Sequence, residues 1–227
     1  MKTIKEGFLR KNLGLGKEEL IRKWLDEHKI INYIINKDLT IDVDGDVDLY
    51  KFTNEEFPSY IQFGIINDGF NIRFSNMTSL RGCPKEVGGN FRCNNCSKLK
   101  SLEGAPKEVG GNFNCSSCPK LESLVGAPEI VGGDFNCGYC FNLTSLEGAP
   151  KKVGGGFYCY NCYNLTSLEG CPQKVDDDFV CSNCFKLTSL EGCPQKVSGA
   201  FSCITCGERF TKDDVEKVSK VKGKISV

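Results

Sequence analysis

The residues of this chain with the most reactive side chains are its cysteines, which number 15 among 227 residues. Six Cys-x-x-Cys pairs follow one another at a step of 22 residues. Four thiolates from two such pairs could bind zinc, and thiols of neighbouring copies could form disulfides. The pairs are Cys93 and Cys96, Cys115 and Cys118, Cys137 and Cys140, Cys159 and Cys162, Cys181 and Cys184, and Cys203 and Cys206.

The composition of the cysteine positions favours packing over either chemistry. In the first copy, Ile72 and Ser75 occupy the two positions of the pair, and a position that accepts isoleucine is a packing position. The other three cysteines, Cys83, Cys171 and Cys193, occupy a column that is alanine in the remaining copies. We therefore expect free thiols that act as small apolar residues, with no cofactor. Zinc and disulfides are kept as alternatives.

A repeat of constant length has to position these cysteines. The pattern V-G-G-x-F-x-C-x-x-C-x-x-L-x-S-L-x-G-x-P recurs between residues 77 and 208 without insertions. Such a step indicates a solenoid, whose coils stack because none can bury its apolar side chains alone. The alternation in F-x-C predicts a short strand, and the recurring proline favours an extended segment over a helix elsewhere in the coil.

Two further columns of the repeat have structural interpretations. The paired glycines turn the chain into the strand, and Asp176 and Asp177 replace one pair, so at least one of these positions is predicted to adopt a left-handed backbone. A serine recurs with no general base beside it, which favours hydrogen bonds to buried backbone between coils over catalysis. These serines are Ser79, Ser101, Ser123, Ser145, Ser167 and Ser189.

The pattern resembles the leucine-rich repeat, whose consensus accepts cysteine at the turn where asparagine is otherwise found. In one copy Phe157 and Cys159 match the strand leucines, Cys162 matches the Asn/Cys position, and Leu165 follows after one inserted residue. The short step resembles compact bacterial effector repeats, and the LTSLEGAP phrase resembles repeats in phage and bacterial proteins. The resemblance implies a mainly β solenoid of short parallel strands with an extended convex side, and an effector or inhibitor of a host protein.

The segment before the repeat is expected to cap the stack. Within residues 1–68, the spacing predicts an amphipathic helix at 17–28, a hairpin or two short strands at 39–49, and an imperfect coil at 57–65. We expect the helix face with Trp24 to seal the first coil, because terminal coils need caps. A docking helix for a partner is the alternative.

Four alternating aspartates in this first cap could be interpreted as a calcium site. The order of an EF-hand loop fails, because its sixth position is not glycine and its twelfth is not glutamate. We interpret these side chains as the solvated face of a capping strand. They are Asp42, Asp44, Asp46 and Asp48.

The repeat domain is expected to span residues 69–208, followed by a second cap at 209–227. In this cap the sequence after Thr211 predicts an N-capped short helix, and residues 222–227 predict a polar tail or a final strand. The fold class predicted for the whole chain is therefore one capped solenoid.

The charge balance argues against several classes of partner. Lysine plus arginine equals aspartate plus glutamate at 29 each, so we expect no nucleic-acid partner. No apolar run approaches the ~18 residues of a membrane span, and the first ten residues lack the apolar core of a secretory signal. We expect a cytoplasmic protein, in the producing or the infected cell, without a membrane partner.

Variation at outward strand positions predicts where a protein partner would bind. The outward positions are neutral over most copies and become aromatic in the fourth and fifth, and rigid aromatic side chains are good binding hot spots. For three of the aromatics, the alternative is that they stack to cover the inserted residue; these are Phe141, Tyr163 and Phe185. The candidate partner-binding residues are Arg92, Asn114, Asn136, Tyr139, Phe141, Tyr158, Tyr160, Tyr163 and Phe185.

The sequence thus favours a non-enzymatic repeat protein that binds another protein through its concave strand face. The alternative from a different class is a zinc-stabilised structural or virion component, with the twelve cysteines of the six pairs as ligands. An enzyme is disfavoured, because the chain has no phosphate-binding glycine loop, no triad spacing and a single histidine, His28.

Overall fold

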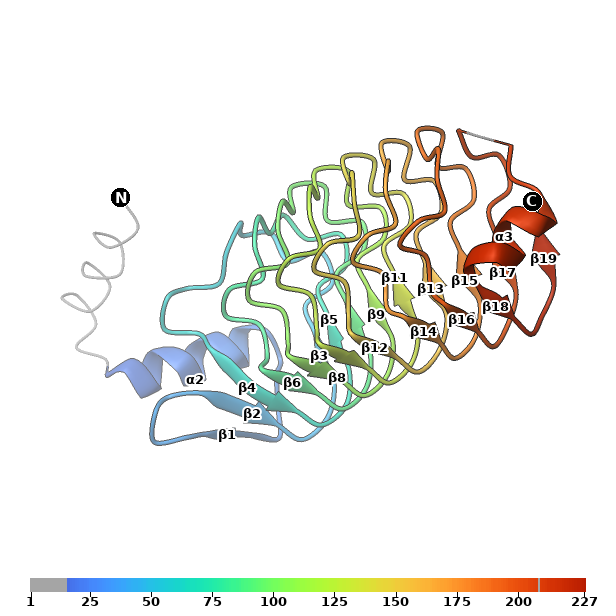
Figure 1. Cartoon of the computed structure of the whole chain (residues 1–227). Helices are drawn as coiled ribbons and strands as arrows, with labels where there is room; N and C mark the ends of the chain where they lie inside the picture. The colour runs from blue at the N-terminus through green and yellow to red at the C-terminus, as the bar shows by residue number, and fades with distance from the viewer. Residues whose placement is uncertain (1–15, 208) are drawn as a thin grey trace.

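The chain winds into a stack of coils, each of which contributes one short strand to each of two sheets (Figure 1). The computed structural model describes residues 16–207 and 209–227. Equivalent residues of successive coils pair in register and in parallel, for example Phe113 with Phe135. The predicted solenoid of short parallel strands is confirmed, and the extended segment after each proline proves to be a strand of a second sheet.

The two sheets run side by side along the whole stack. In spatial order, the ten-stranded sheet consists of β1 (Tyr33–Ile35), β2 (Ile41–Val43), β4 (Phe63–Ile66), β6 (Glu86–Val87), β8 (Glu108–Val109), β10 (Ile130–Val131), β12 (Lys152–Val153), β14 (Lys174–Val175), β16 (Lys196–Val197) and β18 (Lys220–Val221). The nine-stranded sheet consists of β3 (Val47–Asp48), β5 (Phe70–Asn71), β7 (Phe91–Arg92), β9 (Phe113–Asn114), β11 (Phe135–Asn136), β13 (Phe157–Tyr158), β15 (Phe179–Val180), β17 (Phe201–Ser202) and β19 (Ile225–Ser226).

The paired glycines form the corner between the two sheets. A side chain at Gly110 would collide with the backbone oxygen of Gly88 in the preceding coil, and one at Gly111 would collide with an asparagine side chain of that coil. The prediction of a left-handed backbone at this pair is wrong, because positive φ angles occur instead at Gly104 (91°), at Asn95 (60°) and at their equivalents. The corner needs glycine because adjacent coils approach closely there.

Like side chains stack in columns through the core. Neighbouring rings of the phenylalanine column have centroids 5.0 to 5.9 Å apart. The two leucine columns and the valine column are buried beside it, as predicted. Because each side chain contacts its copies above and below, the core is continuous from coil to coil. The phenylalanines are Phe70, Phe91, Phe113, Phe135, Phe157, Phe179 and Phe201.

Helix α2 (Lys17–Glu27) seals the first coil with the face that the sequence predicts. Its Trp24 ring meets Phe52, Phe57 and Phe63 edge to face, with centroids 5.8 to 6.2 Å apart. His28 ends the helix, stacks on Trp24 at 4.0 Å, and its Nδ1 lies 2.8 Å from the Trp24 carbonyl oxygen. The single histidine therefore has a structural place at the helix end.

Residues 39–49 form two short strands, which confirms one of the two predicted alternatives, and the hairpin of the N-terminal region is formed by β1 and β2 instead. Strand β1 pairs with β2 in antiparallel fashion, whereas β2 and β3, which flank Asp44 and Gly45, belong to different sheets and pair in parallel with β4 and β5. The segment 39–49 is thus part of a full coil that precedes the predicted first one. A signal was present in the sequence, since Val47-x-Leu49-x-x-Phe52 has the spacing of the later Phe-x-Cys-x-x-Cys segments.

The C-terminal end adds one more coil and a short helix. Helix α3 (Lys212–Val218) begins at Thr211, whose hydroxyl accepts a bond from the Asp214 backbone N–H while the Asp214 carboxylate accepts from the Thr211 N–H. Strand β19 pairs in parallel with β17, so residues 222–227 contain a final strand. Residues 1–15 of the predicted first cap and residue 208 of the predicted repeat domain lie outside the described residues.

Candidate functional site

The thiols of the six Cys-x-x-Cys pairs form two buried columns, and all fifteen cysteines are free. The second thiol of a pair donates a hydrogen bond to the carbonyl of the first cysteine one coil back, as Cys118 does to Cys93 at 3.3 Å. The same bond recurs at 3.3 Å for Cys140, Cys162, Cys184 and Cys206. The cysteines are buried as the predicted packing role requires, and those of the second column also donate a hydrogen bond.

This hydrogen bond from the thiol takes the place of a backbone hydrogen bond between the two coils, which is lost where the strand ends in a turn. In the parallel register, the Cys93 carbonyl would accept the N–H of Ser116, but that N–H bonds the Asn114 side-chain oxygen at 3.0 Å. In the next coil Gly138 bonds Asn136 in the same way at 2.9 Å. A buried carbonyl without a donor is costly, so a small donor is needed in the second column.

Most of the cysteine thiols are poorly placed for chemistry; the exceptions are Cys96 and Cys206, whose pKa is lowered by hydrogen bonds, in the first place from Cys118 and Cys181. Burial raises the pKa of the thiols of Cys93, Cys115 and Cys159 well above the usual value, and nearby thiols add to the effect. The thiolate is the reactive form, so these groups are weak nucleophiles. Within the described residues, no three histidine, cysteine, aspartate or glutamate side chains form a group that could hold a metal ion.

The serine column bonds within its own coil, and the prediction of bonds between coils is wrong. Ser101 and Ser167 accept hydrogen bonds at 3.0 Å from the backbone N–H two residues ahead, and the equivalent serines of other copies do the same. Such local bonds define a turn. The hydroxyl of Ser79 is buried without a partner.

The four aspartates of the first coil bond the next coil, and Asp44, Asp46 and Asp48 are exposed, as the predicted solvated face requires. Asp42 and Asp46 accept backbone N–H groups at 2.8 and 2.7 Å, and Asp44 and Asp48 accept asparagine side chains at 3.0 and 2.7 Å. The column of Asp46 continues along the stack, where a side-chain oxygen accepts the N–H of the next coil at 2.7 to 2.8 Å. Its members with this bond are Asp46, Asn90, Asn112, Asp134 and Asp178.

Six aromatic side chains, which we call the aromatic cluster, gather on and beside the outer face of the nine-stranded sheet. Phe141, Tyr163 and Phe185 stack on one another with centroids 5.0 and 4.9 Å apart, as the alternative interpretation expects. Tyr139 joins Phe141 to Tyr160 by edge contacts at 6.3 and 5.4 Å. The stack remains exposed, at 36%, 37% and 51%. The members are Tyr139, Phe141, Tyr158, Tyr160, Tyr163 and Phe185.

Two tyrosines of the cluster lie close over glycines. The Tyr160 ring covers Gly138 of the preceding coil, and the Tyr158 hydroxyl lies over Gly156, so a side chain at either glycine would collide with a ring. Burial raises the pKa of Tyr158 to about 12, helped by nearby carboxylates of which Asp134 contributes most. The phenol is therefore neutral and available as a donor at physiological pH.

The polar residues among the predicted partner-binding residues lie in the same column as Tyr158, on the strands that precede it in the sheet. Arg92, Asn114, Asn136 and Tyr158 occupy one outward column in successive strands. The side-chain oxygens of both asparagines accept local backbone bonds, which leaves their NH₂ groups as the donors for a partner. The structure thus places these predicted residues on one face, although Arg92 lies three strands from Tyr158.

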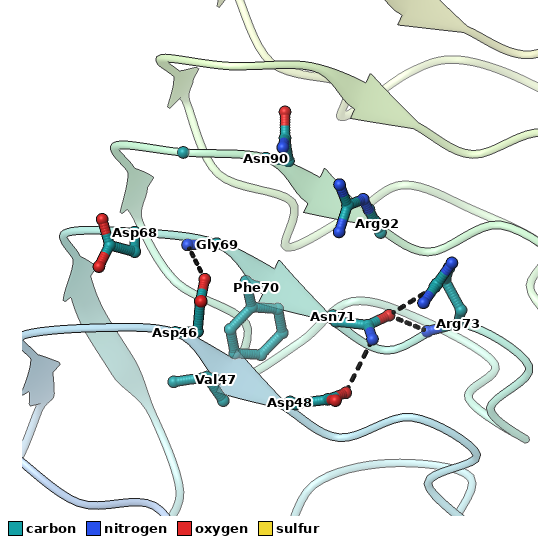
Figure 2. Close-up of a pocket in the computed structure, with 11 residues that line it drawn as sticks. Asp46, Val47, Asp48, Asp68, Gly69, Phe70, Asn71, Arg73, Asn90 and Arg92 are labelled. Atoms are coloured by element: carbon teal, nitrogen blue, oxygen red, sulfur yellow. Dashed lines mark hydrogen bonds between the residues drawn. The ribbon is translucent and has the colours of Figure 1, made fainter.

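Arg92 borders a polar pocket of about 580 Å³ that the sequence did not indicate (Figure 2). Figure 2 shows Asn71 between Asp48, to which its NH₂ donates at 2.7 Å, and Arg73, which donates to it at 3.0 Å. Arg73 also lies over the Tyr50 ring at 5.7 Å. The pocket is open and of mixed charge, and two of its aspartates, Asp46 and Asp48, already bond the neighbouring coil.

The fold and this face define a capped β-solenoid with a cysteine-rich core. Comparison with protein-family models, curated proteins and solved structures found no match to the chain. In the part of the chain that the structure describes, neither helix has the length and apolar character needed to cross a bilayer.

Proposed function

We propose that this protein is a non-enzymatic binding module that captures another protein on the outer face of the nine-stranded sheet. The observation that supports the proposal most is the exposed stack of Phe141, Tyr163 and Phe185 within a cluster of six aromatics. Three stacked rings held at 36% to 51% exposure are costly to leave in water and suit a partner's apolar surface.

The architecture around the cluster supports binding over catalysis. Each ring projects from a rigid coil, so little conformational entropy would be lost on binding. The row of Asn114 and Asn136 offers NH₂ donors beside the rings, as the polar rim of an interface requires. We further propose that the repeat is of the leucine-rich type, with the second cysteine in the Asn/Cys position, and that the protein acts as an effector or inhibitor by occupying its partner.

The experiment compares capture of proteins from host extract by four forms of the chain. Tyr158→Ala/Tyr160→Ala and Phe141→Ser/Tyr163→Ser/Phe185→Ser should each reduce retention of the partner about 30-fold or more, which corresponds to a hot-spot loss of about 2 kcal/mol. Ile31→Ser/Ile34→Ser is the matched control, since both side chains are exposed apolar residues near the N-terminal hairpin (70% and 68%).

Circular dichroism of each variant establishes that the stack is intact. A partner retained equally by the wild type and both aromatic variants would contradict the proposed face. Equal loss with the isoleucine control would place the interaction outside the aromatic cluster.

A further inference from the structure

The outer face of the ten-stranded sheet carries a column of side chains whose charge changes sign along the stack. Its members are the residue before the inward valine in each regular coil and the equivalents at either end. All are exposed, and neighbouring members pair in register. This charge column consists of Ile65, Glu86, Glu108, Ile130, Lys152, Lys174, Lys196 and Lys220.

The charge column is unfavourable for an isolated chain. Adjacent strands are ~4.8 Å apart, and like charges directly opposite each other destabilise a sheet. Lys174 forms an ion pair with Asp176. Among the described residues, no ion pair is formed by Glu86, Glu108 or Lys152.

Over two strands on either side of Ile130, the charges of the column are opposite in sign at equal distances. Strands β8 and β12, one step to either side of β10, carry Glu108 and Lys152, and strands β6 and β14, two steps away, carry Glu86 and Lys174. A two-fold axis along β10 would bring each glutamate opposite a lysine of a second copy. The Ile130 side chains, 37% exposed, would meet at the axis.

We propose that this face binds a second copy of the chain, in a symmetric dimer whose two stacks run in opposite directions. One isologous contact then forms four Glu–Lys pairs, two from each copy. The exposed corner glycines beside the column, Gly110, Gly132 and Gly154, carry no side chain that would hold the sheets apart. In Figure 1 the ten-stranded sheet lies along the lower edge of the stack.

The contact is small and sensitive to salt. The matched part of the column, from Glu86 to Lys174, spans four strand steps, about 19 Å, and is two residues wide, which is little beside the ~1,600 Å² of a standard interface. In the column beside it, Lys107 would face Lys151 of the other copy. Glu129 lies one strand step from this pair and binds Lys151 of its own chain at 2.9 Å, which reduces the repulsion. The dimer should therefore form at low ionic strength and weaken as salt is added.

Charge reversal on the full chain tests the proposal by sedimentation velocity over a concentration series. Glu86→Lys/Glu108→Lys and Lys152→Glu/Lys174→Glu should each be monomeric at low salt, because every pair becomes repulsive. An equimolar mixture of the two variants should dimerise again, and so should the variant with all four reversals. Lys120→Glu/Lys186→Glu is the matched control: it makes the same charge change at exposed lysines away from the sheet and should dimerise like the wild type.

Three results would overturn the proposal. One is a wild-type chain that stays monomeric at low salt and high concentration. Another is self-association that both double variants retain, and the third is a mixture that fails to dimerise. If polyphosphate binds the wild type through the lysines and no dimer forms, the column serves a polyanion and the dimer is wrong. Capture through the aromatic cluster is a separate measurement, so either proposal can fail alone.

Discussion

The first two coils and the later ones follow the same backbone path with different side chains inside. Leu49 and Phe52 of the first coil stand where Cys93 and Cys96 stand in a later one, and the left-handed residue before the second position is kept as Lys51 (φ 59°). The path is thus fixed by the turn and the corner. An interior coil has to match copies of itself and uses small identical residues, whereas the first two coils meet the Trp24 face of α2 and use large, varied ones.

Alkaline pH should produce the largest difference in stability between the first two coils and the later, cysteine-rich ones. Below the ordinary thiol pKa, the thiols of Cys93, Cys115 and Cys159 hold their protons in the folded and in the unfolded chain. Above it the unfolded chain releases them while the buried thiols, whose pKa is raised, do not, so the free energy of unfolding falls. Each such thiol contributes about 1.4 kcal/mol per pH unit.

The cysteines all lie between residues 83 and 206, so we expect circular dichroism, which reports all coils, to change at lower pH than Trp24 fluorescence. Trp24 is the single tryptophan and reports the cysteine-free end. Coincident transitions would show that the two regions unfold as one unit.

Removal of one core leucine should have the next largest effect. Leu146 is fully buried in a regular coil, and Leu146→Ala is expected to lower the free energy of unfolding by about 2 to 5 kcal/mol. Urea denaturation measures the loss, and Val125→Ala, at an exposed residue of the preceding coil, is the control. A loss below about 1 kcal/mol would mean that the stack closes over the cavity.

The donor role of the second thiol column gives a sharper test within the regular coils. Cys140→Ala leaves the Cys115 carbonyl without its donor and should cost about 1 to 3 kcal/mol. Cys140→Ser keeps a donor and should cost less, as the second coil already has Ser75 at this position. If alanine and serine cost the same in urea denaturation, the thiol acts by volume alone.

The corner bond should have the smallest effect and the same effect in both regions. Asp46→Ala in the first coil and Asn90→Ala in a regular coil each remove one side-chain bond to the next coil. Each should lower the thermal stability by about 0.5 to 1.5 kcal/mol, the usual net worth of a hydrogen bond. Unequal losses would mean that the corner, too, differs between the two regions.

The inward columns of the repeat were predictable because the step is constant, so that every copy shows an apolar residue at the same positions. The hairpin partner of β2 was not predictable. The alternation around Ile41 and Val47 suits a hairpin of β2 with β3 as well as separate strands, and the pairing of β2 with β1 is fixed by how β1 and α2 pack on the first coil. The corner glycines were misread for a physical reason: a collision with the preceding coil leaves no trace in local sequence, whereas a positive φ at Asn95 could have been suspected from its residue type.

The repeated corner has a consequence for how such a gene changes with time. Every regular coil packs on the coil before it through one surface and on the coil after it through another, and these two surfaces are the same in each regular coil. If one 22-residue unit is lost, the two coils on either side of it can therefore pack directly on each other. Slipped recombination can therefore lengthen or shorten the protein by whole units. The two caps are not repeated in the chain, so such recombination changes the number of coils between them and leaves the caps themselves unchanged.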